Sequence, residues 1–585
     1  MTTEMRPPAE DPPVLVRAEA GPPLGIDSNR RRPAGRVGGV FGGRFEEHSA
    51  RLLRALGPGA VLATADAPLA VDWDACFEVD GGGEREIRDL ADWRRVLAAG
   101  RLASIRGAFS LVVREPGGAV TLARDGIGER TLFYAPFPPG LVAASTLPAI
   151  LASGLVDRRL DLASVARYLV YAYVPGEATL AEGVFELLPG EILRWREGEL
   201  TRSWLWQLPP ERPEGEAFDE RALTRGLRAR LERAVSRRLP LGEAVGATLS
   251  GGVDSSLVVA LARGFHDRSV FTYSVSFGEG YANELPWSSL VARHCGTRHR
   301  IVEISPEAVV RHLDESIALL SEPIGDPLTV PNALLFREAS RETGVVLNGE
   351  GGDPCFGGPK NLPMLLAELY GGPNEEEAAD PLARERSYLR AHQKCYDDLP
   401  GMLAEEPFDA IAGDRLLREI AWRFEDPRYH RFVSKLQAMN VIFKGGHHIL
   451  PKVDAESFPF GVLPRSPLFD RDVVEAAFGI PPQLKLKGSV EKFLLKESIR
   501  DLLPREILDR PKSGMLVPVE KWFEGPLLPI ARERLLGGLA PMGLIRTDWI
   551  ERLLAGRLGG ARPRRGVKIW LLLTLEAWIR TVFRS

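Results

Sequence analysis

The sequence predicts two domains of different fold class: an α+β sandwich of mainly antiparallel strands, followed by an α/β domain with a parallel sheet and additional helices. Two patterns indicate this. Residues 36–208 contain short β-branched and aromatic runs separated by glycine and proline, whereas strands alternate with helices of about 10 to 15 residues from residue 221 onward. A chain of 585 residues is also long enough for two or more domains, each with its own core.

The composition is that of a globular protein and argues against nucleic acid as a partner. Hydrophobic residues make up 44% and charged residues 26% of the chain, as in ordinary soluble domains. The 79 acidic and 75 basic side chains leave a formal net charge of -4, which gives no overall attraction for nucleic acid. We therefore expect neither a nucleic-acid partner nor a basic RNA-binding module.

Cysteine spacing and apolar runs predict the setting of the protein. The four cysteines are far apart and form no CxxC or Cys/His pattern, which argues against a disulfide framework or a zinc site and favours a reducing, cytoplasmic location. The most apolar run, residues 570–583, contains Glu576 and Arg580 and is shorter than the roughly 20 residues of a membrane span. We expect a buried amphipathic helix there and no membrane partner.

The elements of the first half are predicted in order from the N-terminus. Residues 1–35 hold many prolines and no apolar core, so we expect a disordered tail. A domain of short strands is predicted over residues 36–208, with Pro189-Gly190 as the turn of a closing hairpin. The polar segment 209–220 is predicted to be a linker. The predicted strands lie within residues 37–43, 107–113, 119–123, 131–135, 141–145 and 188–195.

The second half, residues 221–585, is predicted to hold a parallel sheet with helices on both faces, because helices and strands alternate. Beyond residue 360 the pattern is mainly helical. The predicted strands lie within residues 244–249, 269–277, 299–304 and 345–348, and the predicted helices within 222–239, 255–265, 285–295, 306–320 and 332–342.

A loop rich in glycine and serine, between the first strand of this half and the next helix, predicts a phosphate site. Glycines let the backbone approach a ligand, and serines supply hydroxyl donors beside the free N–H groups of a helix start. No lysine follows at GxxxxGK[ST] spacing. Asp254 would have a metal-related role, since Mg²⁺ prefers carboxylates with phosphate oxygens. A turn that binds nothing is the alternative. The loop comprises Leu249, Ser250, Gly251, Gly252, Val253, Asp254, Ser255 and Ser256.

This loop, SGGVDSS, resembles the pyrophosphate loop of N-type ATP pyrophosphatases, and the chain from about residue 36 resembles the asparagine synthetase family. RGAFSLVV, LARDGIGERTLFY and VFELLPGEIL are similar to the family's class II glutamine amidotransferase domain, an Ntn-like sandwich. SEPIGDP, VLNGEGGDPCFGG, PKVD, SPLFD and RPKSGMLVPVEKWF follow in the family's order. The resemblance implies an ATP-dependent ligase that adenylates a carboxylate, releases pyrophosphate and AMP, and uses ATP and Mg²⁺.

The resemblance also implies roles for individual residues. Glu350 aligns with a glutamate that accepts a proton from the attacking amine, which has no lone pair while it is protonated. Lys512 aligns with a lysine that stabilises negative charge on the phosphates. Asp353 aligns with an aspartate that holds substrate or metal, and Arg465 remains from the family's acceptor motif. ATP contacts are implied for Leu249, Val275 and Gly349.

Several charged residues keep more than one interpretation. Asp326 could bind Mg²⁺ or cap the helix that follows it. Lys492 and Lys496 lie four apart on one helix face, which is either solvated or close to phosphate. His447 and His448 are adjacent and would point apart in a helix, so we expect loop residues rather than metal ligands.

The first half lacks the residues for glutamine hydrolysis. Glutaminases of the family use an N-terminal cysteine whose own α-amine serves as base, but the aligned position here is Val37. The Asn-Gly-Glu motif that binds glutamine is not recognisable within residues 72–90. Cys76 is neither terminal nor flanked by histidine, so it is a poor substitute. We therefore predict no glutaminase nucleophile and a domain that keeps the fold without the activity.

The sequence does not identify the carboxylate substrate or the nitrogen donor. Leu463 replaces the glutamate of the family's acceptor motif, which puts aspartate as the substrate in doubt. The leading interpretation joins a small-molecule or peptide carboxylate to ammonia or an amine. The alternatives are intramolecular amide formation, as in lasso-peptide cyclases and β-lactam synthetases, and a nucleotide-binding homologue without catalysis. A homodimer is a further open alternative.

Overall fold

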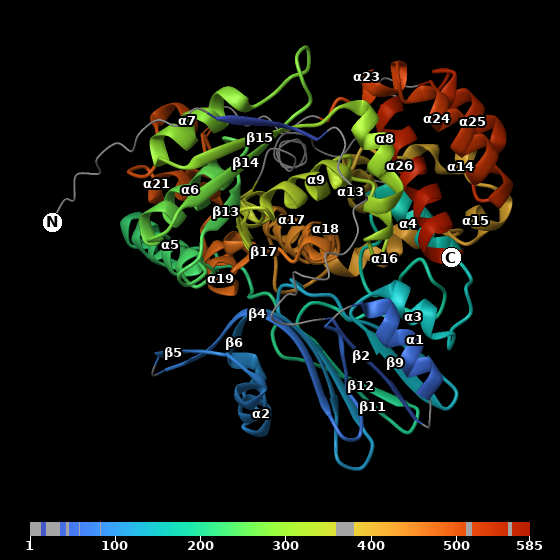
Figure 1. Ribbon diagram of the computed structural model, residues 1–585, viewed down its shortest axis with the longest axis horizontal. Coiled ribbons are helices and arrows are strands. Elements are labelled where there is room, and N and C mark those ends of the chain that lie inside the picture. Colours follow the sequence, from blue (N-terminus) through green and yellow to red (C-terminus); the bar gives the residue numbers. More distant parts are fainter. Residues whose placement is uncertain are drawn as a thin grey trace.

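The computed structural model places two mainly antiparallel sheets in the first half of the chain and one parallel sheet in the second, so the predicted fold class is confirmed. Figure 1 shows the antiparallel sheets below and the parallel sheet with its helices above. The structure describes residues 13–18, 36–42, 46–57, 59–81, 83–357, 380–488, 490–510, 517–559 and 564–584.

The first half forms a sandwich of a five-stranded and a six-stranded sheet, in the orders β10-β8-β9-β2-β3 and β12-β11-β7-β6-β4-β5. In β11, buried residues alternate with more exposed ones, so this strand turns one apolar side inward. The strands are β2 (Val37–Phe41), β3 (Val61–Leu62), β4 (Leu69–Asp80), β5 (Gly83–Glu86), β6 (Ile105–Arg114), β7 (Val120–Arg124), β8 (Phe133–Phe137), β9 (Gly140–Ala144), β10 (Phe185–Glu186), β11 (Glu191–Arg196) and β12 (Glu199–Trp204), with helices α1 (Glu46–Leu56), α2 (Leu90–Ala98), α3 (Leu147–Ser153) and α4 (Leu162–Tyr171).

The parallel sheet has six strands in the order β1-β15-β14-β13-β16-β17. Its central strands β13, β14 and β16 are short and buried, which is typical of parallel sheets covered by helices, whereas the edge strand β1 is mostly exposed. In Figure 1, α6 and α7 lie on one side of it and α9 on the other. The strands are β1 (Val14–Arg17), β13 (Val245–Thr248), β14 (Val270–Ser276), β15 (Arg298–Glu303), β16 (Val345–Leu347) and β17 (Leu463–Arg465); β18 (Leu486–Lys487) and β19 (Val490–Glu491) form a separate hairpin.

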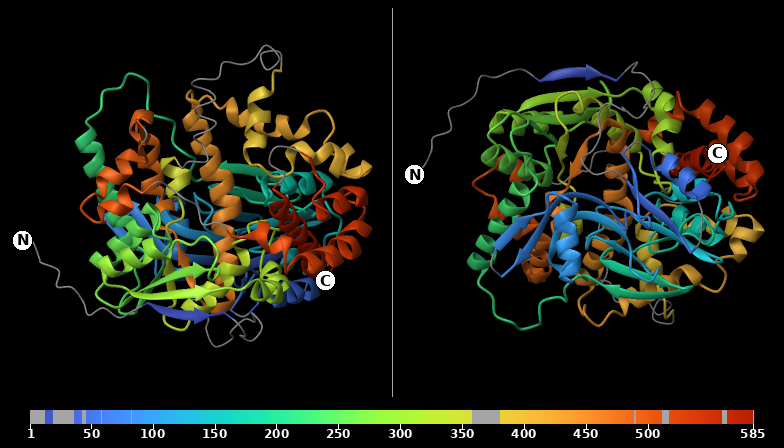
Figure 2. Two further views of the ribbon diagram at one scale, coloured as in Figure 1. Left: turned by 90° about the horizontal axis from the view of Figure 1, so that it is seen from above. Right: turned by 60° about the horizontal axis from the view of Figure 1, so that its bottom comes forward.

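The helices of the second half surround this sheet and build a helical layer at the C-terminal end, shown in orange and red in both views of Figure 2. Among the described residues, no helix combines the length and the apolarity needed to cross a membrane. The helices are α5 (Glu220–Ser236), α6 (Val253–Phe265), α7 (Leu285–Cys295), α8 (Pro306–Ala318), α9 (Thr329–Ala339), α10 (Gly352–Phe356), α13 (Ala383–Ala391), α14 (Leu399–Met402), α15 (Glu405–Asp409), α16 (Arg415–Phe424), α17 (Phe432–Met439), α18 (Leu450–Ser457), α19 (Arg471–Gly479), α20 (Pro482–Lys485), α21 (Phe493–Ser498), α22 (Arg505–Leu508), α23 (Val519–Glu524), α24 (Leu528–Arg534), α25 (Thr547–Leu554) and α26 (Arg565–Trp578).

Part of the segment predicted as a disordered tail is a strand, which corrects that prediction. β1 pairs in parallel with β15, with Val14 opposite Arg300 and Arg17 opposite Glu303. The β-branched run of this segment suits an edge strand, and pairing with β15 satisfies its backbone groups. The prediction missed β1 because the partner strand is almost 300 residues away in the sequence. Residues 1–12 and 19–35 lie outside the described part of the chain.

Candidate active site

The phosphate loop lies where β13 ends and α6 begins, as predicted. The Ser250 and Ser255 hydroxyls are 3.1 Å apart, and the Gly252 N–H donates to the Ser250 hydroxyl at 3.3 Å. Gly251 has a left-handed backbone with φ +75°, and a Cβ atom there would lie 2.5 Å from the Cβ of Trp287. Only glycine fits this turn, which lets the loop close tightly at the first turn of α6.

The loop that follows β16 touches the phosphate loop. β13 and β16 are parallel neighbours, so their carboxyl ends meet at one edge of the sheet. A Cβ on Gly349 would lie 2.5 Å from the Ser255 nitrogen, and one on Gly352 would lie 2.2 Å from the carboxyl carbon of Asp254. These glycines bring Glu350 and Asp353 to the edge that carries the phosphate loop.

A lysine links the two carboxylates that were predicted as metal ligands. The Lys492 ammonium lies 2.6 Å from an oxygen of Asp254 and 2.6 Å from an oxygen of Asp353. Its side chain is only 4% exposed, which excludes the solvated alternative for Lys492. Burial opposes the charged form of Lys492, but the two carboxylates outweigh it and raise its pKa. Lys496, four residues later, is half-buried and outside this triad.

Glu350 lies in an environment that favours its neutral form. Burial raises the pKa of Glu350, and the charges of Asp326 and Asp353 raise it further, whereas Lys452 and Lys444 lower it. The Glu350 N–H donates to the Asn348 side-chain oxygen at 3.1 Å, which fixes the turn at the end of β16. A carboxyl group with a raised pKa beside a phosphate loop is suited to proton transfer.

A second buried ion pair lies beside Glu350 and was missed by the sequence reasoning. The Lys452 ammonium lies 2.5 Å from an Asp326 oxygen, and His448 is 3.6 Å from the same oxygen and stacks on Tyr173. Burial works against ionised Asp326, but Lys452 and His448 outweigh it and lower its pKa well below the usual value. The only signal for Lys452 was its place in the PKVD motif, to which no role had been given.

The same geometry gives the partners of Asp326 and corrects the prediction for the histidines. One Asp326 oxygen accepts the Leu328 N–H at 3.0 Å, just before α9, and the other faces Lys452. His447 and His448 belong to a π-helical segment, Asn440–Ile449, that joins α17 to α18, so they are not loop residues. They do point apart, since His447 pairs with Glu186 at 2.9 Å.

Of the residues implied near the nucleotide, the structure describes Leu249 and Val275 but not Lys512. Leu249 and Val275 are buried at the ends of the neighbouring strands β13 and β14. The Leu249 N–H donates to the Tyr273 carbonyl at 2.8 Å. Lys512 lies outside the described residues. Arg510, two positions earlier, donates to the Gly251 carbonyl at 3.2 Å, so the described chain reaches the phosphate loop just before that lysine.

Arg465 does not join this group. It ends β17, next to β16, and its carbonyl accepts the Asn348 N–H at 3.0 Å. Its guanidinium instead forms two hydrogen bonds, of 2.7 and 2.8 Å, with the Asp74 carboxylate of the first half. The side chain predicted to hold substrate is thus committed to the boundary between the two halves.

In the first half, the position aligned with the glutaminase nucleophile is closed. Val37 is fully buried, and its N–H donates to the Ser145 hydroxyl at 2.8 Å. Cys76 is also buried, and its thiol contacts the Ala108 carbonyl at 3.2 Å. Burial, followed by the charge of Asp74, raises the pKa of Cys76 well above the usual value, which disfavours a thiolate.

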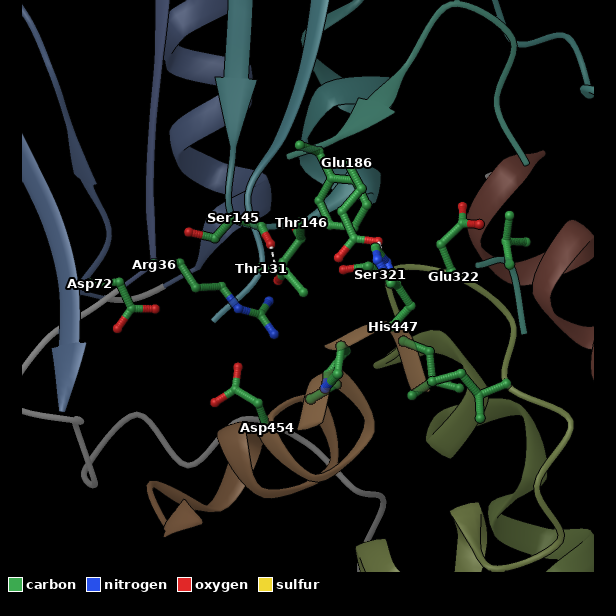
Figure 3. Close-up of a pocket in the computed structure, with 16 residues that line it drawn as sticks. Arg36, Asp72, Thr131, Ser145, Thr146, Glu186, Ser321, Glu322, His447 and Asp454 are labelled. Carbon is green, nitrogen blue, oxygen red and sulfur yellow. Dashed lines mark hydrogen bonds and ion pairs between the residues drawn. The ribbon is translucent and has the colours of Figure 1, made fainter. Parts of the chain in front are cut away.

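A small cavity lies beside this position, between the two halves (Figure 3). Its polar lining includes carboxylates from both halves, and the figure shows Asp72 and Asp454 on either side of Arg36. Asp72 is not a free acid, because Arg130 lies 3.4 Å from it and 3.2 Å from Asp454. Other lining residues are Ser145, Glu186, Glu322 and His447.

The residues present fit ATP and Mg²⁺. Two polar groups at the edge that carries the phosphate loop, the Ser256 hydroxyl and the Asn348 amide nitrogen, are buried and lack a hydrogen-bond partner in the described part of the chain. Such groups suit a ligand rich in acceptor oxygens. Asp254 and Asp353 lie close enough to share the Lys492 ammonium. Mg²⁺ commonly binds through one or two carboxylates together with phosphates.

Comparisons with known proteins agree with this geometry. A Mycobacterium bovis protein provisionally named as a glutamine-hydrolysing asparagine synthetase is 27% identical over 546 residues, which covers 86% of this chain and 80% of that one. An asparagine synthetase from Bacillus subtilis is 24% identical, with 81% and 78% covered. A protein from Gibberella zeae named amidase chry2 is 24% identical, with 73% and 72% covered.

Family models match both halves. The model for the glutamine amidotransferase domain matches residues 96–206, and the model for asparagine synthase matches residues 226–580, more than half of the chain. The amidotransferase-like sandwich and the ATP-pyrophosphatase-type sheet are therefore parts of one enzyme. The chain belongs to the asparagine synthase family of ATP-dependent, AMP-forming carbon–nitrogen ligases.

Proposed function

We propose that this ligase forms an amide from an activated carboxylate and free ammonia or an amine, and that it does not take its nitrogen from glutamine. The single observation that carries the proposal is the site at Val37. This residue has no nucleophilic group, and its backbone nitrogen is an amide inside β2 that donates to Ser145. It offers neither the thiol nor the free α-amine that the family's glutaminase chemistry needs.

The neighbouring thiol supports the same conclusion. Cys76 sits in a β-bulge between Asp74 and Phe77, where the register of β4 and β6 shifts. Its burial and its acidic neighbour keep the sulfur protonated, and a neutral thiol is a weak nucleophile. No histidine is among the groups that shift the pKa of Cys76.

In the second half, the residues would divide the work between phosphate binding and proton transfer. ATP, when bound, supplies the α-phosphate that a substrate carboxylate attacks, with pyrophosphate as the leaving group. The Ser250 and Ser255 hydroxyls and the first turn of α6 would hold the pyrophosphate. We assign Mg²⁺ to Asp254 and Asp353. Glu350 would accept the proton that the amine loses as the amide forms.

Two measurements on the purified protein test this proposal. A screen for AMP and pyrophosphate release with amino acids and carboxylate peptides, each with ammonium, should identify a substrate. With that substrate, ammonium should support amide formation, whereas glutamine should yield neither product nor glutamate. Glutamate release from glutamine at a rate matching AMP formation contradicts the loss of glutaminase activity, and no AMP formation with any carboxylate contradicts the ligase assignment.

Intramolecular amide formation is the second candidate, favoured by the acceptor side of the site. Leu463 stands where the family usually has glutamate, and it is buried in β17. Arg465, which is retained from that motif, forms an ion pair with Asp74. These changes argue for a substrate other than aspartate. AMP formation with a carboxylate that carries its own amine, and without ammonium, would identify a cyclising enzyme.

A further inference from the structure

Lys492 places a positive charge between the two carboxylates that we assign to the metal. It lies 2.6 Å from Asp254 on α6 and 2.6 Å from Asp353 on α10, so one ammonium joins the phosphate loop to the loop that carries Glu350. The side chains of Asp254 and Asp353 are 15% and 29% exposed, against 4% for Lys492. The Asp254 oxygen that faces away from the lysine is itself buried against Gly352, so the more accessible carboxylate of the pair is that of Asp353.

The backbone at Lys492 is also unusual. It has a left-handed conformation with φ +53°, immediately before α21. This conformation is unfavourable for a residue with a Cβ, and such residues cluster at functional sites. The conformation turns the chain between the β18–β19 hairpin and α21, where the Lys492 side chain meets the two carboxylates.

A metal ion and the ammonium would use the same carboxylates. Two cations that share two carboxylates repel one another, and burial strengthens that repulsion. Binding of Mg²⁺ to Asp254 and Asp353 therefore weakens the hold on Lys492. The incoming phosphates bring new negative charge to the same edge, and an ammonium is a strong phosphate partner.

We propose that Lys492 is a positioning residue that exchanges partners: its ammonium holds Asp254 and Asp353 together before the metal binds, and moves to the phosphate oxygens when Mg²⁺ takes the carboxylates. This inference rests on the proposed function, since it requires a metal–phosphate ligand. It goes beyond that function by giving the site a built-in cation that the metal must displace.

The exchange predicts opposite effects on two ligands. In Lys492→Met, Mg²⁺ alone should bind about tenfold more tightly, because the competing cation is gone. Pyrophosphate, at saturating Mg²⁺, should bind about tenfold more weakly, because a phosphate partner is gone. Isothermal titration calorimetry measures both affinities without turnover. A lysine with only a structural role would weaken both ligands or neither, and that result would overturn the proposal.

Lys496→Met is the matched control, since it removes a half-buried lysine of α21, the helix that begins immediately after Lys492. Both affinities should stay within about twofold of wild type. If the wild-type protein binds neither Mg²⁺-pyrophosphate nor Mg²⁺-ATP, the proposed function itself fails. If wild type binds them and Lys492→Met shows no opposite shift, only the exchange fails.

A second measurement does not depend on the folding of a variant. In crystals of the wild-type protein with Mg²⁺ and pyrophosphate, the Lys492 ammonium should lie on a phosphate oxygen and Mg²⁺ on the two carboxylates. An ammonium that still bridges Asp254 and Asp353 in that complex would overturn the proposal.

Discussion

Two acidic side chains at the active site differ in charge state because their partners differ. Asp326 is held ionised by Lys452 and His448 despite its burial, whereas burial and neighbouring acids push the pKa of Glu350 upward. One carboxylate is thus fixed as a counter-ion and the other can exchange a proton. When the environments of two carboxyl groups move their pKa values apart, one site can hold both a fixed counter-ion and a group that exchanges a proton.

We expect Glu350 to set the acidic limb of the pH–rate profile. A base must be deprotonated to work, and a raised pKa moves the loss of activity to a higher pH than an ordinary glutamate would give. Glu350→Gln should lower amide formation about 100-fold or more, while ATP–pyrophosphate exchange continues. Glu342→Gln, at a distant ion pair with Arg300, is the control. Loss of exchange together with amide formation would contradict a role limited to proton transfer.

A buried lysine connects stability to pH. Lys485 donates to the Gln437 side-chain oxygen, and Gln437 donates to the Cys355 carbonyl at 2.7 Å, in the helix α10 that carries Asp353. Burial lowers the pKa of Lys485 to about 7. Between that pH and about 10 the unfolded chain binds more protons, so stability should rise with pH by up to about 1.4 kcal/mol per unit. Denaturant unfolding at pH 7.5 and 9 should show a smaller rise in Lys485→Met; equal slopes would contradict this.

At the scale of elements, the sequence predicted the features that depend on interactions between residues close together in the chain. The turn at Gly251 and the start of α6 depend on residues within one short segment, and both were predicted. β1 and the place of Lys492 depend on contacts far apart in the sequence, such as the contact of Lys492 with Asp254, 238 positions away. His447 and His448 were expected in a loop, yet they lie within a helical segment that also contains Gly445 and Gly446.

These two glycines serve packing. A Cβ on Gly446 would lie 2.7 Å from Pro189 of the first half, and the Gly446 carbonyl accepts from Arg124 at 2.8 Å. Gly446→Ala should therefore lower the free energy of unfolding by about 2 kcal/mol through overpacking. Gly264→Ala in α6, where nothing lies within 4 Å of the new Cβ, should raise it by up to about 1 kcal/mol. Chemical denaturation compares the two; equal effects would contradict the packing role.

At the scale of the whole molecule, the two proposed domains share a core. One apolar cluster includes Phe133 of the sandwich together with Tyr273 and Leu571 of the second half. The Tyr168 hydroxyl on α4 donates to the Leu571 carbonyl at 2.8 Å, across the proposed linker at 209–220. Ion pairs also join the two halves, namely Arg465 with Asp74, Arg238 with Glu129 and Arg106 with Asp472.

This shared core predicts one cooperative unfolding unit. Calorimetry of the full chain should give a single transition, because separating the halves would expose apolar surface and leave buried charges such as Asp74 without partners. Asp74→Asn should lower the midpoint of that transition without splitting it, and Asp66→Asn, at an exposed turn, should leave it unchanged. A chain cut to residues 221–585 should not fold on its own. Two separable transitions would show instead that the sandwich is an independent domain, whose loss of glutaminase chemistry leaves the ligase unaffected.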